Sequence, residues 1–227
     1  MTRRFLFASL LLFAMIGCGP SQSTARNPNG ADGAGASTNA APVRPPQFAT
    51  DDAGWGRFHS KRFQLSVPLP DGKSWKIDDH SKPELVATHP PTSSRVLIVT
   101  TQEEDLMNRQ RCEKRARDLG HVPKNELTTV EDEVTTGPDA YDSRVWVALD
   151  AARPGGSVDG HVFLFGAFLR KCLIVHLTTS VPSAKDEDVL SSRLAIARAR
   201  VIRGLTLDPM RTTDDATVPK DKPEIKR

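Results

Sequence analysis

The 227-residue sequence lacks several patterns that mark common enzymes and membrane proteins. Its six histidines include no pair spaced four residues apart, so no helix face carries the two imidazoles typical of a zinc site. It contains no Gly-x-Ser-x-Gly and no Ser-x-x-Lys motif, which present the serine nucleophile in two large hydrolase classes. The sequence therefore predicts no metal site and no cofactor, and it indicates no catalytic residue.

A strong net charge is also missing. The formal charge is +3, and removal of residues 1–17, which contain Arg3 and Arg4 but no acid, lowers it to +1. The three tryptophans, Trp55, Trp75 and Trp146, lie at intervals that suit packing rather than a platform for stacked bases. We therefore expect no nucleic-acid partner.

The N-terminus has the order of an export signal. Arg3 and Arg4 precede a run of about 12 apolar or small residues, too short for a membrane-spanning helix, which needs about 20. The run ends in Met15-Ile16-Gly17-Cys18, which resembles the lipobox of bacterial lipoproteins. The resemblance implies that residues 1–17 are a signal peptide, that Cys18 carries diacylglycerol and an N-acyl chain such as palmitate, and that these lipids anchor the chain.

The same resemblance bears on location. Gly19, rather than aspartate, follows the lipidated cysteine, and under the sorting pattern of enteric bacteria this favours the outer over the inner membrane. We expect a lipid-anchored protein of the cell envelope, with its folded part in the periplasm or at the cell surface. A plain signal peptide with an incidental cysteine is the alternative.

Two cysteines remain once Cys18 is assigned to lipid. In an oxidising compartment Cys112 and Cys172 are expected to form a disulfide. Closing a loop of about 60 residues stabilises a fold by roughly 4 kcal/mol in the chain-entropy model. Two buried thiols or one reactive cysteine are the competing interpretations.

Composition divides the rest of the chain. Residues 18–50 are mostly Gly, Ala, Ser, Thr, Asn and Pro, which predicts a disordered linker with a reach of about 30 Å. Residues 208–227 are polar and charged, with Pro219 and Pro223, and predict a disordered tail. Residues 51–207 are long enough for one globular α/β domain.

Strand patterns dominate this domain. Apolar and polar residues alternate over Phe63–Pro68, which indicates a half-buried strand. The run His161–Val175 is apolar on both faces, which is typical of strands in a sheet that helices cover on both sides. We predict strands at 63–68, 74–78, 84–88, 95–100, 127–135, 141–150, 160–168 and 172–179.

Two helices are predicted from their ends. The first covers 102–119, with a capping box of Thr101 and Glu104, a closing Gly120, and a buried stripe of Cys112, Ala116 and Leu119. The second covers 184–203 and begins at Ser183. Its predicted buried stripe consists of Leu190, Leu194, Ala197 and Val201.

A strand Phe63-x-Leu65-x-Val67-Pro68 leading to Trp75, then strands, a helix, antiparallel strands and a closing helix, resembles the Mog1/PsbP-like family over residues 55–208. The resemblance implies an α+β fold, an α/β/α sandwich whose mainly antiparallel sheet is covered by helices. In that family the fold serves mainly as a binding and assembly module, and the members share no catalytic triad.

The densest group of chemically active residues is Asp78-Asp79-His80, with His89 on a neighbouring strand. The four side chains could meet across a turn, or they could belong to a solvated turn with no further role.

Two basic half-helices could touch anionic lipid or lipopolysaccharide. They consist of Arg109, Arg111, Lys114, Arg115 and Arg117, and of Arg193, Arg198, Arg200 and Arg203. Alternatively, these charges solvate a helix face and complement the helix dipole.

The leading hypothesis is a membrane-anchored, non-enzymatic binding or assembly module of the cell envelope, with an unidentified envelope protein as its partner. The alternative is an envelope hydrolase, or an enzyme acting on a small ligand, that uses the Asp78-Asp79-His80 and His89 region.

Overall fold

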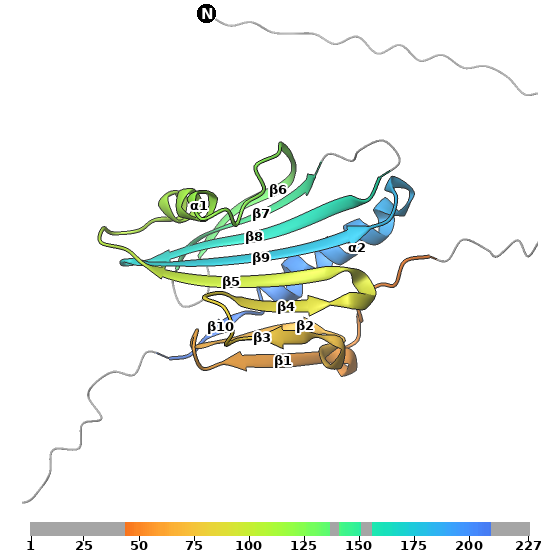
Figure 1. The fold of residues 1–227 in the computed structure, drawn as a ribbon, viewed down its shortest axis with the longest axis horizontal. Helices are drawn as coiled ribbons and strands as arrows, with labels where there is room; N and C mark the ends of the chain where they lie inside the picture. The colour runs from red at the N-terminus through yellow and green to blue at the C-terminus, as the bar shows by residue number, and fades with distance from the viewer. Residues whose placement is uncertain (1–43, 137–140, 151–155, 210–227) are drawn as a thin grey trace, which may run out of the picture. The chain divides into compact units, whose positions relative to one another are not determined.

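A seven-stranded antiparallel sheet forms the centre of the computed structural model, which describes residues 44–136, 141–150 and 156–209 (Figure 1). Its strands lie in the order β3-β4-β5-β9-β8-β7-β6. Their bounds are Lys76–Asp78 (β3), Leu85–His89 (β4), Ser94–Gln102 (β5), Leu127–Thr136 (β6), Asp142–Asp150 (β7), Val158–Phe168 (β8) and Lys171–Val181 (β9). The strands predicted within this sheet are confirmed, with ends displaced by a few residues.

A second sheet of three strands packs beside the first. It has the order β1-β2-β10, with bounds Trp55–Ser60 (β1), Leu65–Pro70 (β2) and Thr206–Leu207 (β10). The sequence did not predict β1 or β10. Pro68 was expected to end β2, but the strand continues to Pro70, paired with β1. On its other side β10 pairs only with Leu65 and Ser66, so no strand there needs a hydrogen bond from Pro68.

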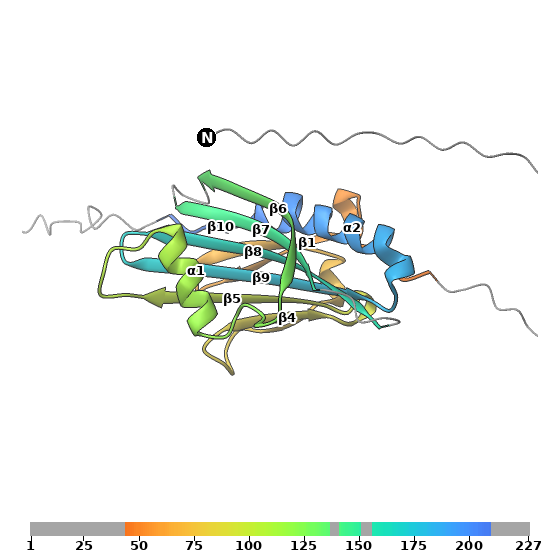
Figure 2. The ribbon, with the colours of Figure 1, turned by 90° about the horizontal axis from the view of Figure 1, so that it is seen from above.

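Helices cover both faces of the large sheet (Figure 2). Helix α1 (Arg109–Asp118) lies against β8 and β9 on one face. On the other face, α2 (Glu187–Ile196) continues as a π-helical segment, η6 (Ala197–Ile202). Short 3₁₀ helices are η1 (Asp52–Gly54), η2 (Gly72–Ser74), η3 (Pro90–Thr92) and η5 (Ala184–Asp186).

The two faces of the sheet bury separate apolar cores. Alternate residues of β8 serve each core: Phe163 and Phe165 face α1, whereas Val162 and Leu164 face α2 and the small sheet. The predicted two-sided burial of this strand is confirmed. So is the buried stripe of the closing helix, Leu190, Leu194, Ala197 and Val201.

The first helix is shorter than predicted. It begins after Asn108, whose side chain accepts a hydrogen bond from Arg111 N, so the predicted capping box of Thr101 and Glu104 is wrong. Thr101 instead pairs with Cys172 at the end of β5. The C-terminal prediction is confirmed, because Gly120 has φ +77° and closes the helix, but Leu119 is 39% exposed rather than buried.

The folded domain extends beyond its predicted bounds of 51 and 207. Phe48, expected in the linker, is 2% exposed within the core. Asp208, expected in the tail, donates its backbone N–H to Gln64 O at 2.7 Å. The predicted signal peptide, Cys18, most of the linker and residues 210–227 lie outside the described residues. Within the ranges that are described, no helix has the length and apolar character needed to cross a membrane.

Candidate functional site

The side chains of the acids and histidines proposed as a catalytic cluster do not converge, and Asp78 and His80 interact only through the His80 backbone N–H. Asp78 accepts hydrogen bonds from the Ser81 hydroxyl and backbone, which lower the pKa of its carboxyl to about 2. Asp79 is buried and accepts a hydrogen bond from Ser60 Oγ at 2.9 Å. His80 is exposed. No interaction among the described residues joins these three side chains to His89.

His89 is a buried residue of the core. It is 2% exposed, stacks on Trp75 at 5.1 Å between ring centroids, and places Nδ1 2.7 Å from Thr92 Oγ1. Burial lowers the pKa of its imidazole, against the opposing effect of Asp71. In residues 44–136, 141–150 and 156–209, no group of three or more His, Cys, Asp or Glu side chains could hold a metal ion.

Most of the two predicted basic half-helices is neutralised by acids. On α1 the pairs are Arg109–Asp142, Arg111–Asp105, Lys114–Asp118, Arg115–Glu103 and Arg117–Glu113. After α2 they are Arg198–Glu131, Arg198–Glu133, Arg200–Asp52 and Arg203–Glu133. Hydrogen bonds from Arg203 and Arg198 hold the pKa of Glu133 below its usual value. The structure therefore favours the role of these arginines in solvating and pairing the helix faces.

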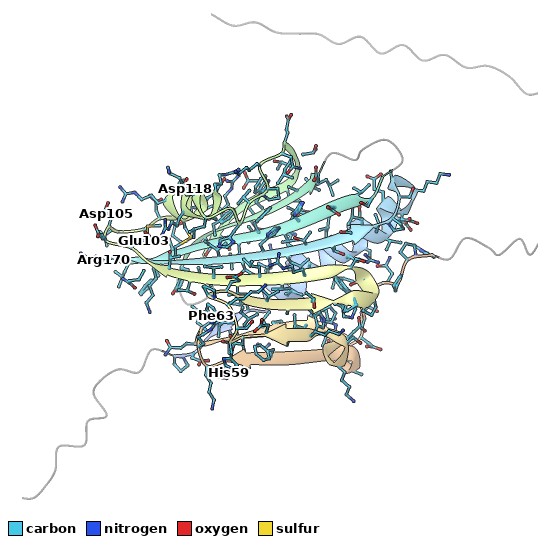
Figure 3. The ribbon with its side chains drawn as sticks, in the orientation of Figure 1. His59, Phe63, Glu103, Asp105, Asp118 and Arg170 are labelled. Atoms are coloured by element: carbon cyan, nitrogen blue, oxygen red, sulfur yellow. A yellow bond between two sulfur atoms is a disulfide. The ribbon has the colours of Figure 1, made fainter. Side chains whose placement is uncertain are left out.

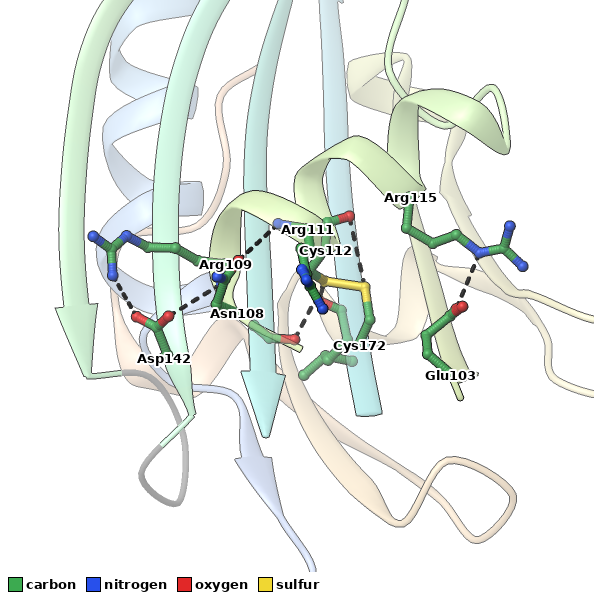
Figure 4. Close-up of a disulfide and its surroundings, with 10 residues drawn as sticks. Glu103, Asn108, Arg109, Arg111, Cys112, Arg115, Asp142 and Cys172 are labelled. Carbon is green, nitrogen blue, oxygen red and sulfur yellow. Dashed lines mark hydrogen bonds and ion pairs between the residues drawn. A yellow bond between two sulfur atoms is a disulfide. The ribbon is translucent and has the colours of Figure 1, made fainter. Parts of the chain in front are cut away.

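The expected disulfide is present and joins α1 to β9 (Figure 4). Cys112 and Cys172 have their Cα atoms 5.3 Å apart, and both side chains are fully buried. The bond holds the helix against the strand beside the β8–β9 hairpin tip. Cys18, the predicted lipid attachment site, lies outside the described residues.

A cavity of about 540 Å³ opens at one end of the domain, and we call it the terminal cavity. It forms where the core between the large sheet and the small sheet reaches the surface. Its walls come from the β1–β2 turn, the end of β5, the start of β7, the β8–β9 hairpin tip and the segment after β10. Most of its lining is apolar: Phe63, Leu106, Tyr141, Phe168, Leu169 and Leu173.

Backbone contacts between distant segments fix the rim of the terminal cavity. Met107 N donates to Leu169 O at 2.6 Å, and Glu103 N donates to Arg170 O at 2.8 Å. The loop after β5 is therefore attached to the β8–β9 hairpin. Figure 3 shows Phe63 and Arg170 at this same end of the domain, although more than 100 residues separate them in sequence.

Two residues of the terminal cavity have left-handed backbone conformations. Gln64 has φ 54° and Leu169 has φ 52°. Leu169 and Arg170 form the two-residue turn of the β8–β9 hairpin, where a positive φ is favoured and glycine or asparagine is usual. A leucine there costs roughly 1–3 kcal/mol in strain. The Leu169 side chain is nevertheless 64% exposed, so its own burial offsets little of that cost.

Polar side chains at the terminal cavity include two cations, Arg170 and Lys171, one carboxylate, Asp208, and the side chains of Gln64, Thr100 and Gln102. Both cations are exposed and lie at the hairpin tip. In the part of the chain that the structure describes, no ion pair joins a carboxylate to either of them.

Two of the acids at this end are paired with other side chains. Glu103 pairs with Arg115 at 3.0 Å, and Asp208 lies 2.9 Å from His59 Nε2. Glu104 and Asp105 follow Glu103 in a loop that lines a separate depression toward α1. The lining of the terminal cavity therefore carries two cations and one carboxylate, and its interior is apolar.

A pair of histidines lies on the opposite face of the large sheet, outside the terminal cavity. His161 Nδ1 is 3.0 Å from His176 Nε2, and His176 stacks on Phe163 at 4.2 Å. Burial lowers the pKa of both imidazoles, that of His176 to about 3, so both rings are neutral at physiological pH. They act as part of the aromatic core beneath α1.

The sequence did not reveal the terminal cavity. Arg170 and Lys171 served only as an argument against a membrane span, although an exposed Leu-Arg turn between two apolar strands is an unusual hairpin tip. Phe63, Tyr141 and Leu207 come from three distant segments, and no sequence spacing indicates that they meet. The sequence could have indicated only the unusual backbone conformation of Leu169, because the turn between the two apolar strands had to fall near that residue.

Comparison with known proteins identifies the fold. No family model and no curated protein matches the chain. Among solved structures, LpqN, described as involved in cell envelope biogenesis of Mycobacterium tuberculosis, has 9% identity and a TM-score of 0.42, covering 72% of this chain and 99% of that one. A Bacteroides thetaiotaomicron protein has 10% identity and a TM-score of 0.38, covering 68% and 48%. A single-substitution mutant of Mog1 has 7% identity and a TM-score of 0.50, covering 68% of this chain and 97% of that one. The chain therefore has a Mog1/PsbP-like α+β fold.

Proposed function

We propose that this chain is a lipid-anchored, non-enzymatic protein of the cell envelope that binds an apolar or amphiphilic ligand in the terminal cavity. The observation that carries the proposal is the cavity itself, at about 540 Å³ within the range of small-molecule sites. Its apolar lining and few polar groups match the usual composition of such sites.

The arrangement of the domain supports an anchor at the N-terminal side. The described chain begins, in orange, at one end of the large sheet, and it ends beyond β10, in blue, at the other (Figures 1 and 2). The terminal cavity lies at the blue end, because Leu207 and Pro209 line it. A lipid on Cys18 would therefore hold the chain by the end remote from the cavity. The disulfide is also typical of an exported protein.

The anchor is tested by replacing its cysteine. We expect Cys18→Ser to convert a membrane-bound protein into a soluble or uncleaved one, because each buried CH₂ of a lipid contributes about 0.8 kcal/mol to membrane binding. Subcellular fractionation with immunoblotting measures this. Circular dichroism of the secreted variant should match that of the wild type, because residue 18 lies outside the domain. If Cys18→Ser is cleaved normally and is still found in the membrane fraction, the proposed lipid anchor is wrong.

The cavity is tested by filling it. Thr100 is exposed and lines the cavity, so Thr100→Trp should place an indole in the space that a ligand would occupy. The reference protein for this test is the chain from residue 18 onward with Cys18→Ser and no other change. We expect it to bind the neutral fluorescent probe N-phenyl-1-naphthylamine. Adding Thr100→Trp should lower its affinity for the probe about tenfold, a loss of about 1.4 kcal/mol in binding free energy.

The matched control is Thr88→Trp, on β4 and outside the cavity lining, which should keep the wild-type affinity. Thermal unfolding of both variants checks that the domain remains folded. If the wild type does not bind the probe, or if Thr100→Trp binds it as well as Thr88→Trp, the proposed ligand site is wrong.

A further inference from the structure

Arg170 and Lys171 are two adjacent exposed cations at the rim of the terminal cavity. Cations on α1 and on the segment after α2 are matched with acids, mostly within 3.0 Å. Arg170 and Lys171 differ, because the ion pairs of the acids at this end are with other side chains: Glu103 with Arg115, Asp105 with Arg111 and Asp208 with His59. Their positive charge is therefore available to a ligand that enters the cavity.

The apolar part of the cavity continues directly into the core. Tyr141 and Leu173 belong to that core and form the floor, with 7% and 2% exposure. Phe168 stacks on Tyr141 at 5.4 Å between ring centroids. A hydrocarbon chain entering from the rim would thus pass from two cations onto aromatic and aliphatic side chains.

Two exposed leucines at the rim also favour a ligand with a hydrocarbon chain. Leu106 is 66% and Leu169 is 64% exposed, and both line the cavity. They come from two segments joined by the hydrogen bond from Met107 N to Leu169 O. The strained turn holds Leu169 at the entrance, where it gains burial only when a ligand covers it.

We propose that the terminal cavity binds one molecule of a single-chain anionic amphiphile, with its hydrocarbon chain inside and its carboxylate or phosphate group against Arg170 and Lys171. The proposal rests on the proposed function and adds the chemical class of the ligand. A cavity of about 540 Å³ suits one drug-sized molecule rather than a lipid with two chains. Guanidinium groups bind carboxylate and phosphate through paired, charge-assisted hydrogen bonds.

The test is displacement of N-phenyl-1-naphthylamine from the mature chain with Cys18→Ser. The competitors are dodecyl phosphate, laurate and dodecyltrimethylammonium, all below their critical micelle concentrations. We expect the two anionic compounds to displace the probe at concentrations at least about tenfold lower than the cationic one. The variant Arg170→Glu with Lys171→Glu should weaken dodecyl phosphate about tenfold or more and leave affinity for the neutral probe within about twofold.

The matched control is Lys124→Glu with Lys185→Glu, which changes the net charge equally at exposed positions outside the cavity. It should retain the preference for anions. Equal displacement by anions and cations, or equal loss of anion affinity in both double variants, overturns the proposed ligand class. Those results leave the cavity's binding of the neutral probe standing, whereas absence of probe binding refutes the proposed function itself. A further comparison uses a chain that ends at Pro209. If this shorter chain binds dodecyl phosphate and the chain that includes residues 210–227 does not, the proposal is also overturned, because residues 210–227 then occupy the cavity.

Discussion

Replacement of Arg193 by alanine is expected to lower the free energy of unfolding by about 2–5 kcal/mol. Arg193 is 1% exposed and has no carboxylate partner among the described residues. Its guanidinium donates to Pro46 O, to Thr92 O at 2.9 Å, to Ser180 O at 2.8 Å and to Thr179 Oγ1 at 3.3 Å. Alanine removes the guanidinium donors of Pro46 O and Ser180 O, whereas Thr92 O and Thr179 Oγ1 still accept from Ser94 Oγ. Each unsatisfied buried group costs about 1–3 kcal/mol.

Comparing Arg193→Lys with Arg193→Ala separates the contribution of the positive charge to stability from that of the hydrogen-bonding geometry of the guanidinium. Burial lowers the pKa of the arginine, yet a guanidinium stays protonated, whereas a lysine amine is more easily neutralised. Lysine offers fewer donors in a different geometry, so its stability should fall between those of wild type and alanine. Urea unfolding measures all three chains.

The control for this series is Lys185→Ala, which is exposed and should change stability by less than about 0.5 kcal/mol. An alanine variant at residue 193 within about 1 kcal/mol of wild type contradicts the assigned role of the buried arginine.

Loss of the disulfide is the second change with a large expected effect. We expect Cys112→Ala with Cys172→Ala to lower the free energy of unfolding by roughly 4 kcal/mol, because the bond closes a loop across 60 residues. Both side chains are fully buried in the core beneath α1, so lost packing adds to the loss of the crosslink. The measurement is urea unfolding of the soluble mature chain.

Reduction provides the matched control. Dithiothreitol should destabilise the wild-type domain by a similar amount and leave the double alanine variant unchanged. Mass spectrometry without reductant should find neither cysteine alkylated in the mature protein. Free thiols at both positions in the protein isolated from cells would show that the bond does not form there.

Much of the fold follows from local patterns. The strong alternation of β2 and the two-sided apolar run of β8 and β9 predicted strands correctly, because burial on one or both faces of a sheet dictates those patterns. The closing helix was equally clear. The first helix was not, since Glu103 and Glu104 mimic a helix start while backbone bonds to the β8–β9 hairpin hold this loop. Local propensity could not reveal a tertiary contact.

The site was less predictable than the fold. Asp78, Asp79 and His80 are adjacent in sequence, but the structure gives them separate partners, and His89 is a core residue. The residues of the terminal cavity are dispersed from Phe63 to Pro209 and share no chemical motif. Basic clusters on helices were visible, but their neutralisation by acids from other strands was not. The position of the terminal cavity depends on how the strand ends meet in the folded domain, which local sequence patterns do not indicate.

Phe48 and Arg193 also determine how a mechanical load would enter the domain. A force applied through the chain before residue 44 first reaches the ion pair of Arg44 with Asp188, and then the hydrogen bonds from Arg193 to Pro46 O and the buried Phe48 ring. Those groups pass the load to α2 and to β9, at the centre of the large sheet, before it reaches β1. The small sheet is thereby protected from being separated strand by strand when the chain is pulled from its N-terminal side.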